Sequence, residues 1–302
     1  DFGEGYWTDH WSYGLDLIED FLRIWPEREQ ELMQMELPWY RPQAQILPRE
    51  KRYSVSGGEL RQYHFLEETP GEKWCRDGAE NLVKATLLEK LVCMCAMKFA
   101  ALDAWGCGIE MEGGRPGWYD ALNGLPALFG SSVTEAMELL RHLRFLKVSL
   151  RRYGGKVSLP GPHSMLLMRL KQSVEDIPEY TGNTVLVDFW NSSKSALEHC
   201  REEVYTQGAW DYADCQAEQL AEMLDTWANF LGQRLALCRG ENGVMPTYCR
   251  YRVKMDQGTP SFEKCDMPLF LESSVRDMRL CESEQKREKL FEAVHRSELF
   301  DG

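Results

Sequence analysis

The segment LVCMCAMKFAAL, residues 91–102, is the most apolar run of the chain. It belongs to the second half of a region, residues 79–105, whose apolar periodicity predicts one long helix. Because this second half is apolar all round, we expect it to be buried on every side. The run includes Lys98 and is too short to cross a bilayer, so we interpret it as a core helix and expect no contact with a membrane.

The sequence before this run predicts one helix and one hairpin. Leu15, Ile18 and Leu22 share one helical face, and Pro26 ends that helix. The stretches KRYSV and LRQYHF, within residues 51–65, are joined across a Ser-Gly-Gly turn and predict a β-hairpin.

The sequence after the run is also mainly helical. Ser132 and Glu135 have the spacing of a capping box, which begins a helix that reaches about residue 150. The stretch MPTYCRYRVKM, residues 245–255, is a short β candidate. We therefore expect residues 1–302 to form a single all-α domain with small β-hairpin excursions. The remaining helices are expected at about residues 192–207, 209–238 and 274–299.

Composition narrows the classes of function. The 302 residues include 35 Lys and Arg against 48 Asp and Glu, which gives a net charge of −13. Phosphate backbones are bound by clustered basic residues, so we do not expect a nucleic-acid partner. Uncharged ligands such as sugars are compatible with this balance.

The ten cysteines include no C-x-x-C pair, so we expect no zinc ribbon and no metal site. Several stand at helical spacing among Leu and Met, which is typical of small buried side chains. We therefore expect a reducing, cytoplasmic setting. The first residues lack the pattern of a signal peptide and a starting Met, so we interpret the chain as a segment cut from a longer protein.

Two segments combine carboxylates, tryptophans and glycines. DFGEGYWTDHW, residues 1–11, stands directly before a predicted helix, and GIEMEGGRPGWYDALNGLPALFG, residues 108–130, includes Asp120. Glycines let a backbone approach a ligand closely, tryptophan faces match the C–H faces of a pyranose ring, and carboxylates bind hydroxyl groups. This mixture indicates a sugar site. Surface turns that Asp caps and Trp covers would give the same pattern, and that alternative stays open.

The same segments carry a resemblance. Residues 1–22 and 112–146 resemble the catalytic domain of inverting β-glucan phosphorylases, namely the cellobiose phosphorylase family (glycoside hydrolase family 94) and the related β-1,3-glucan phosphorylases. The resemblance implies an (α/α)6 barrel. Since about six long helices are predicted where twelve are needed, we expect a partial barrel. The resemblance is also compatible with a homodimer.

The resemblance assigns roles to individual residues. The family's general acid is the Asp of a Trp-Asn-Asp motif, and the matching positions here are Trp118, Tyr119 and Asp120. Asp120 is therefore the expected acid and Trp118 the expected sugar platform, although Tyr119 replaces the family's Asn. The family's aromatic-Arg-Asp motif resembles Trp7-Thr8-Asp9, which makes Asp9 an expected sugar ligand. The full set of expected substrate-binding residues is Glu4, Trp7, Asp9, His10, Arg115, Trp118 and Tyr119.

A phosphate site requires positive charge, and the family's phosphate-binding His and Thr-Gly pair have no clear match here. Lys156 and His163, in or near the glycine-rich stretch RRYGGKVSLPGPH, are the candidates. Arg151 and Arg152 are better explained by the favourable position of cations at a helix C-terminus. Inorganic phosphate is expected as co-substrate, and no other cofactor is expected.

The expected reaction is inverting phosphorolysis of a β-glucosidic bond in a gluco-oligosaccharide, which gives a sugar 1-phosphate. A protonated Asp120 would donate its proton to the glycosidic oxygen while phosphate attacks from the opposite face of the ring. Two alternatives stay open. One is an inverting glycoside hydrolase with Asp9 or Glu4 as base, and the other is a helical sugar-binding module without catalysis.

Overall fold

The structure is a mixed α/β fold. In the computed structural model, helices account for 54% and strands for 22% of the described residues. The expectation of an all-α partial (α/α)6 barrel is therefore wrong, because stretches interpreted as connecting loops pair as antiparallel strands. The described residues are 11–41, 44–63, 66–69, 71–112, 128–177, 184–206, 211–256 and 258–300.

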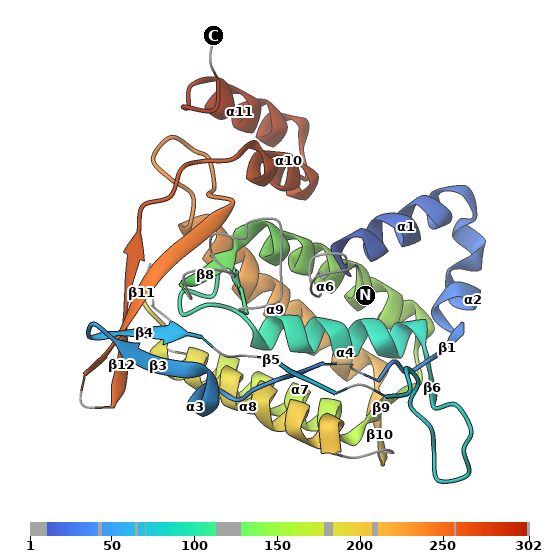
Figure 1. Ribbon diagram of the computed structural model, residues 1–302. Helices are drawn as coiled ribbons and strands as arrows, with labels where there is room; N and C mark the ends of the chain where they lie inside the picture. The colour runs from blue at the N-terminus through green and yellow to red at the C-terminus, as the bar shows by residue number, and fades with distance from the viewer. Residues whose placement is uncertain are drawn as a thin grey trace.

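Helix α4 (Leu87–Ala100) lies at the centre of the helical part. It packs against α6 (Val133–Tyr153), α7 (Gly161–Glu175) and α8 (Val187–Thr206), and α6 packs in turn along α9 (Ala217–Leu237) (Figure 1). The predicted burial of the apolar run is confirmed. The α4 side chains that lose all exposure are Val92, Cys95, Ala96, Phe99 and Ala100.

Helix α4 begins eight residues later than predicted because of its cap. The Glu89 backbone N–H donates to the Thr86 hydroxyl at 3.2 Å, and the Thr86 N–H donates to the Glu89 carboxylate at 2.7 Å. This reciprocal pair fixes the first turn. The residues just before it form β6 (Lys84–Thr86), which pairs with β1 (Glu36–Pro38).

The largest sheet has four antiparallel strands. Their order is β12 (Thr259–Cys265), β11 (Tyr248–Asp256), β8 (Phe129–Ser132) and β7 (Ile109–Glu110). The β7–β8 pairing continues through the Met111 N–H, which donates to the Gly130 carbonyl at 2.8 Å. The chain therefore leaves the sheet at residue 112 and returns near residue 128 at the same place.

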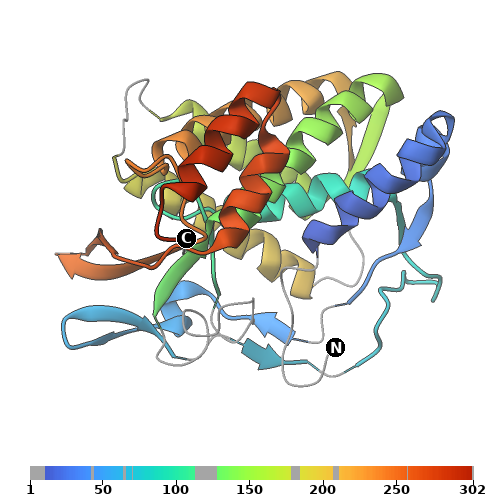
Figure 2. The ribbon, with the colours of Figure 1, turned by 90° about the horizontal axis from the view of Figure 1, so that it is seen from above.

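Small strand pairs cover one side of the helices. In Figure 2 the blue strands lie along one edge, while α6, α10 (Leu271–Leu280) and α11 (Glu284–His295) lie on the opposite side. The pairs at this edge are β2 (Ala44–Ile46) with β5 (Leu66–Glu68) and β3 (Tyr53–Ser56) with β4 (Glu59–Gln62). A separate pair, β9 (Lys156–Pro160) with β10 (Tyr212–Gln216), contacts α7.

Several local predictions are confirmed. Helix α1 (Trp11–Ile24) ends before a short 3₁₀ turn that begins at Pro26. The predicted hairpin is β3–β4, and its turn places Gly57 and Gly58 at φ 62° and 80°, a region in which glycine avoids the strain that a Cβ causes. The β candidate at residues 245–255 is β11.

Other local predictions are wrong in their bounds. Helix α9 begins at Ala217 instead of residue 209, because residues 212–216 pair with β9. Helix α7 lies in a stretch for which the sequence analysis predicted no helix. The expected last helix, residues 274–299, is the two helices α10 and α11, and the Ser283 hydroxyl caps the second by accepting the Lys286 N–H.

The cysteines fall into two groups. Cys107 and Cys238 form a disulfide that joins the loop before β7 to the end of α9, which the expectation of a reducing setting did not include. The other eight are free. Most of these are buried as expected, and burial raises the pKa of the Cys200 thiol to about 12, so this thiol stays protonated at neutral pH.

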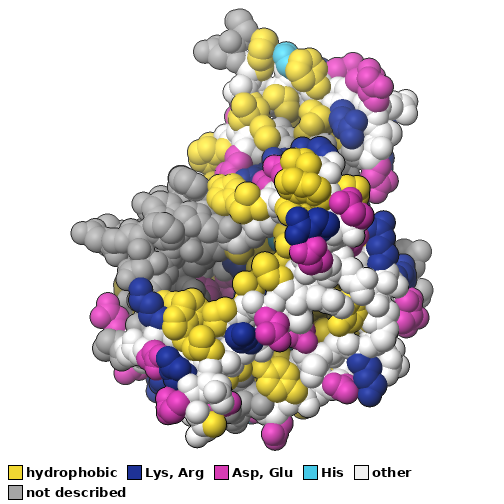
Figure 3. All heavy atoms as spheres, turned by 90° about the vertical axis from the view of Figure 1, so that its right-hand side faces the viewer, with side chains coloured by type: hydrophobic (Ala, Val, Ile, Leu, Met, Phe, Trp, Pro, Cys, Tyr) yellow, Lys and Arg dark blue, Asp and Glu magenta, His cyan; other side chains and the backbone are white. Residues whose placement is uncertain are grey.

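The surface mixes charges and apolar groups. On the face that carries α1 and α2 (Glu29–Met33), acidic and basic side chains alternate with apolar ones (Figure 3). Leu17 and Ile24 of α1 are 73% and 65% exposed. No single sign of charge covers the described part of this face.

Candidate functional site

Most of the predicted sugar site lies outside the described residues. Eight of its ten residues belong to two segments, residues 1–10 and 113–127. Their roles therefore stay predictions. The contacts given below are those of the described residues that flank the two segments in sequence. The eight are Glu4, Trp7, Asp9, His10, Arg115, Trp118, Tyr119 and Asp120.

The two stretches that resemble β-glucan phosphorylases contact each other directly. The Trp11 indole N–H donates to the Glu135 carboxylate at 2.9 Å across 124 positions of sequence. Lys98 donates to the same oxygen at 3.1 Å and lies 4.8 Å from the centroid of the Trp11 ring. One helical turn further along each helix, Arg141 binds Asp16 at 3.0 Å. The Glu135 carboxylate thus joins the stretches instead of completing the predicted capping box.

A small hollow lies where these stretches meet. Ser12 and Tyr13 line it from α1, and Met111 lines it from the strand that leads into residues 113–127. Its volume is about 20 Å³, which is enough for about one water. The hollow formed by the described residues is therefore too small for a sugar ring. The hollow is completed by Ser132, Thr134, Glu135, Glu138, Tyr248, Glu272 and Arg276.

The described lining of the hollow is acidic. It contains three carboxylates and one guanidinium, that of Arg276. The Glu138 carboxylate, 2% exposed, binds Arg276 at 3.0 Å and Arg141 at 2.5 Å. Arg276 also lies 5.7 Å from the centroid of the Tyr13 ring. This arrangement fixes α10 and α6 against the start of α1.

A neutral histidine, His142, packs against Trp11 near the hollow. The His142 ring lies 5.0 Å from the Trp11 ring, and its Nδ1 is 2.8 Å from the Glu138 carbonyl. Burial lowers the pKa of His142 to about 4, and the positive charges of Arg141 and Lys98 act in the same direction. The imidazole is therefore uncharged at neutral pH, and Nδ1 carries the proton that the carbonyl accepts.

The two phosphate candidates lie apart from the hollow. Lys156, on β9, is exposed and binds Asp214 at 3.2 Å. His163 is buried in the first turn of α7 and stacks on Trp39 with the ring centroids 5.7 Å apart. Burial lowers the pKa of His163 to about 4, so it offers phosphate no positive charge at neutral pH. The phosphate role of both residues stays a prediction, and neither lines the hollow or the cleft described next.

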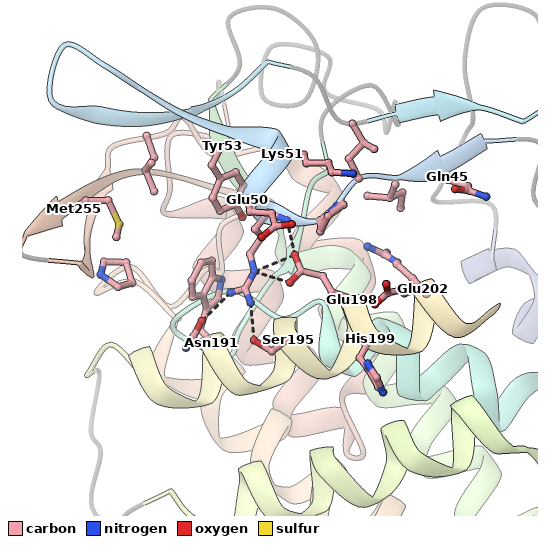
Figure 4. Close-up of a pocket in the computed structure, with 18 of the residues that line it drawn as sticks. Gln45, Glu50, Lys51, Tyr53, Asn191, Ser195, Glu198, His199, Glu202 and Met255 are labelled. Carbon is pink, nitrogen blue, oxygen red and sulfur yellow. Dashed lines mark hydrogen bonds and ion pairs between the residues drawn. The ribbon is translucent and has the colours of Figure 1, made fainter. Parts of the chain in front are cut away.

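A much larger cleft, of about 970 Å³, runs along α8 (Figure 4). We call it the α8 cleft. One wall is the exposed face of α8, and the other is the segment through α3 (Arg49–Arg52) and β3. Met255 and Gln45 lie at its opposite ends (Figure 4). Its volume is in the range of small-molecule sites.

Arg49 organises the cleft (Figure 4). Its Nε donates to both oxygens of Glu198 at 3.1 Å, and the Arg49 backbone N–H donates to the same carboxylate at 2.7 Å. Its two terminal nitrogens donate to Asn191 at 3.0 Å and Ser195 at 2.8 Å. The guanidinium also lies 5.2 Å from the centroid of the Trp190 ring. One arginine therefore holds several cleft side chains in place.

A buried ion network anchors the strand that enters residues 113–127. Glu110 accepts a hydrogen bond from the Tyr251 hydroxyl at 2.5 Å and binds Lys194 of α8 at 2.6 Å, where both charged side chains are about 5% exposed. Two residues later, Glu112 binds Arg201 of α8 through both oxygens, at 2.6 and 3.0 Å. Burial lowers the pKa of Lys194, and the Glu110 charge opposes that effect. Helix α8 thus forms ion pairs with this segment at two positions, Glu110 and Glu112.

Sequence reasoning missed the cleft and the network. Lys194 and Arg201 lie on one face of α8, seven residues apart, among residues that are otherwise buried. Two basic residues on the buried face of a predicted helix are a signal for partners elsewhere in the core. Within the described ranges, no group of three or more His, Cys, Asp or Glu side chains could hold a metal ion.

Comparisons with known proteins give no assignment. No protein-family model matches the chain, and no curated protein matches it either. Over the part of the chain that the structure describes, no helix combines the length and the apolar character that a bilayer crossing requires.

Proposed function

We propose that this chain belongs to an enzyme that cleaves a β-glucosidic bond of a gluco-oligosaccharide by inverting phosphorolysis. The observation that supports it is the hydrogen bond from Trp11 to Glu135, which joins the two stretches that resemble β-glucan phosphorylases. The family pattern requires both stretches to contribute to one site. The Trp11–Glu135 contact joins described residues of the two stretches. The proposal rests on these motifs and not on the fold.

In the proposed reaction a phosphate oxygen attacks C1 of the glucosyl unit from the face opposite the leaving group. The bond between C1 and the glycosidic oxygen breaks, and the proton of Asp120 moves to that oxygen. The products are an α-glucosyl phosphate and a shortened oligosaccharide. Since phosphate is already an anion, the reaction needs no catalytic base.

The test measures phosphate-dependent release of sugar 1-phosphate. The full-length protein is incubated with cello-oligosaccharides and with laminari-oligosaccharides, each with and without inorganic phosphate. We expect glucose 1-phosphate to form only in the presence of phosphate, and its anomeric configuration, read by NMR, to be α. Absence of sugar phosphate from every mixture would contradict the proposal.

Inverting hydrolysis is the second candidate, and a specific observation favours it. The described lining of the hollow carries three carboxylates and a single cation, Arg276, that Glu138 already binds. A hydrolase needs a carboxylate base, expected at Asp9 or Glu4, whereas a phosphorylase needs positive charge beside the sugar. Glucose release that does not depend on phosphate would select this candidate in the same experiment.

We also propose a cytoplasmic setting, which the eight free cysteines support. The disulfide between Cys107 and Cys238 is the observation against it.

A further inference from the structure

We propose that the α8 cleft is a second binding site, for a chain of uncharged sugar units, separate from the site expected around Asp120. That the units are β-linked glucose rests on the proposed function. That the ligand is uncharged, polyhydroxylated and extended rests on the cleft itself.

The charge of the cleft excludes polyanions. Its lining includes five carboxylates but only three side chains that are always cationic. Two of these cations are engaged, since Arg49 binds Glu198 and Arg201 binds Glu112. Phosphate groups or nucleic acid would therefore meet net negative charge and occupied guanidinium groups.

The cleft offers donors and acceptors side by side. Asn191 and Ser195 accept from Arg49 through their oxygens, which leaves the Asn191 amide N–H groups and the Ser195 hydroxyl proton as donors. Next to them, the carboxylates of Asp188 and Glu202 have no hydrogen-bond or ion-pair partner among the described residues. A sugar hydroxyl both donates and accepts, so a mixture of this kind suits it.

These polar groups form a row along one helix. Asp188, Asn191, Ser195 and Glu202 stand at helical spacing on the exposed face of α8. From the first to the last of them the helix rises about 21 Å, which is long for a single sugar ring and suits several linked units. The apolar parts of the opposite wall, such as Pro48 and Leu60, would face the C–H groups of the rings.

The test uses the full chain and isothermal titration calorimetry with cellopentaose and with laminaripentaose. The cleft variant is Asp188→Ala with Glu202→Ala, chosen because neither side chain has a partner among the described residues. The control variant, Glu222→Ala with Glu241→Ala, removes the same charge from exposed positions outside the cleft. We expect the cleft variant to bind at least one pentasaccharide about tenfold more weakly, or with one site fewer, and the control to bind like the original protein.

Trp118→Ala separates this inference from the proposed function. If both are right, Trp118→Ala removes one site and the cleft variant removes the other. If the proposed function fails and the cleft binds sugar, Trp118→Ala leaves binding unchanged while the cleft variant loses it. The inference is overturned if the cleft variant binds both pentasaccharides as the control does, or if the original protein binds neither.

Discussion

The hollow and the α8 cleft meet the same short strand but are built in different ways. Met111 lines the hollow, whereas the next residue, Glu112, binds Arg201, which lines the cleft. The hollow encloses about 20 Å³ among the described residues and the cleft about 970 Å³. Both regions are formed by segments that are distant in sequence, but among the described residues only the cleft is wide enough for a ligand.

Under the two proposals above, catalysis and binding belong to different regions of the molecule. The motif residues expected to do chemistry belong to the segments that precede Trp11 and follow Met111 in sequence. The cleft has the Asn191 amide, held by Arg49, and two carboxylates without a partner among the described residues, but no side chain with an expected catalytic role. Substitutions beside the hollow should then change turnover, and substitutions in the cleft should change affinity. The predictions below test this division.

The largest effect is expected for Asp120→Asn. The amide cannot donate the proton that the leaving oxygen needs, so turnover should fall by about a hundred- to ten-thousandfold. The melting temperature should stay nearly the same, because the substitution keeps the size of the side chain. Sugar phosphate release and thermal unfolding are measured on the same sample. Asp188→Asn, in the cleft, is the matched control and should keep its turnover at saturating substrate.

A fully active Asp120→Asn protein would remove this residue from the mechanism. Equal losses for Asp120→Asn and Asp188→Asn would instead show that the hollow and the cleft are not separate in function.

The second largest effect, on the free energy of unfolding, is expected for Glu110→Gln, in the strand β7 that lies next to both the hollow and the α8 cleft. Glu110→Gln leaves the buried Lys194 ammonium without its counter-charge, so the free energy of unfolding should fall by about 3–5 kcal/mol. Replacing both residues, with Glu110→Gln and Lys194→Met, should recover most of this loss because no buried charge is left unpaired. Urea unfolding followed by circular dichroism measures both.

Glu202→Gln, at the exposed face of the same helix, should change stability by about 0.5 kcal/mol or less. If Glu110→Gln is equally mild, the buried pair does not anchor the strand. If the double variant is as unstable as the single one, the loss comes from packing and not from the unpaired charge.

How far the sequence predicts these features depends on the range of the interactions involved. The Gly57-Gly58 turn, the stop at Pro26 and the buried face of residues 91–102 are set by neighbours within a few positions, and all three predictions are confirmed. The start of α9 was missed because it depends on a strand partner more than 40 residues away, whereas the start of α4 follows from the local capping box of Thr86 and Glu89, which the sequence analysis did not use.

The candidate site shows the same limit. The motifs predict that Asp9 and Asp120 share one site, and this stays a prediction. The Trp11–Glu135 contact, which joins described residues of the same two stretches, was not predicted. The cleft has no motif, because its wall comes from residues 45–53 and its floor from α8, which are more than 130 positions apart. The all-α prediction failed for a related reason: two-stranded pairs of three to five residues leave little periodic signal in a sequence.

The smallest effect is a pH dependence that should belong to the hollow and not to the cleft. Burial lowers the pKa of His142 to about 4 in the folded protein, against about 6.5 when unfolded. The unfolded chain therefore binds the proton more readily, and the free energy of unfolding should fall as the pH drops from 6.5 to 4, by up to about 3 kcal/mol from this residue. Urea unfolding across that range measures the slope. His142→Gln should remove the part of the slope that His142 contributes and leave the part due to His163, whose pKa burial also lowers to about 4. If His142→Gln unfolds with the original slope, then the imidazole beneath Trp11 takes up its proton without unfolding, and the hollow is more open to solvent than its contacts indicate.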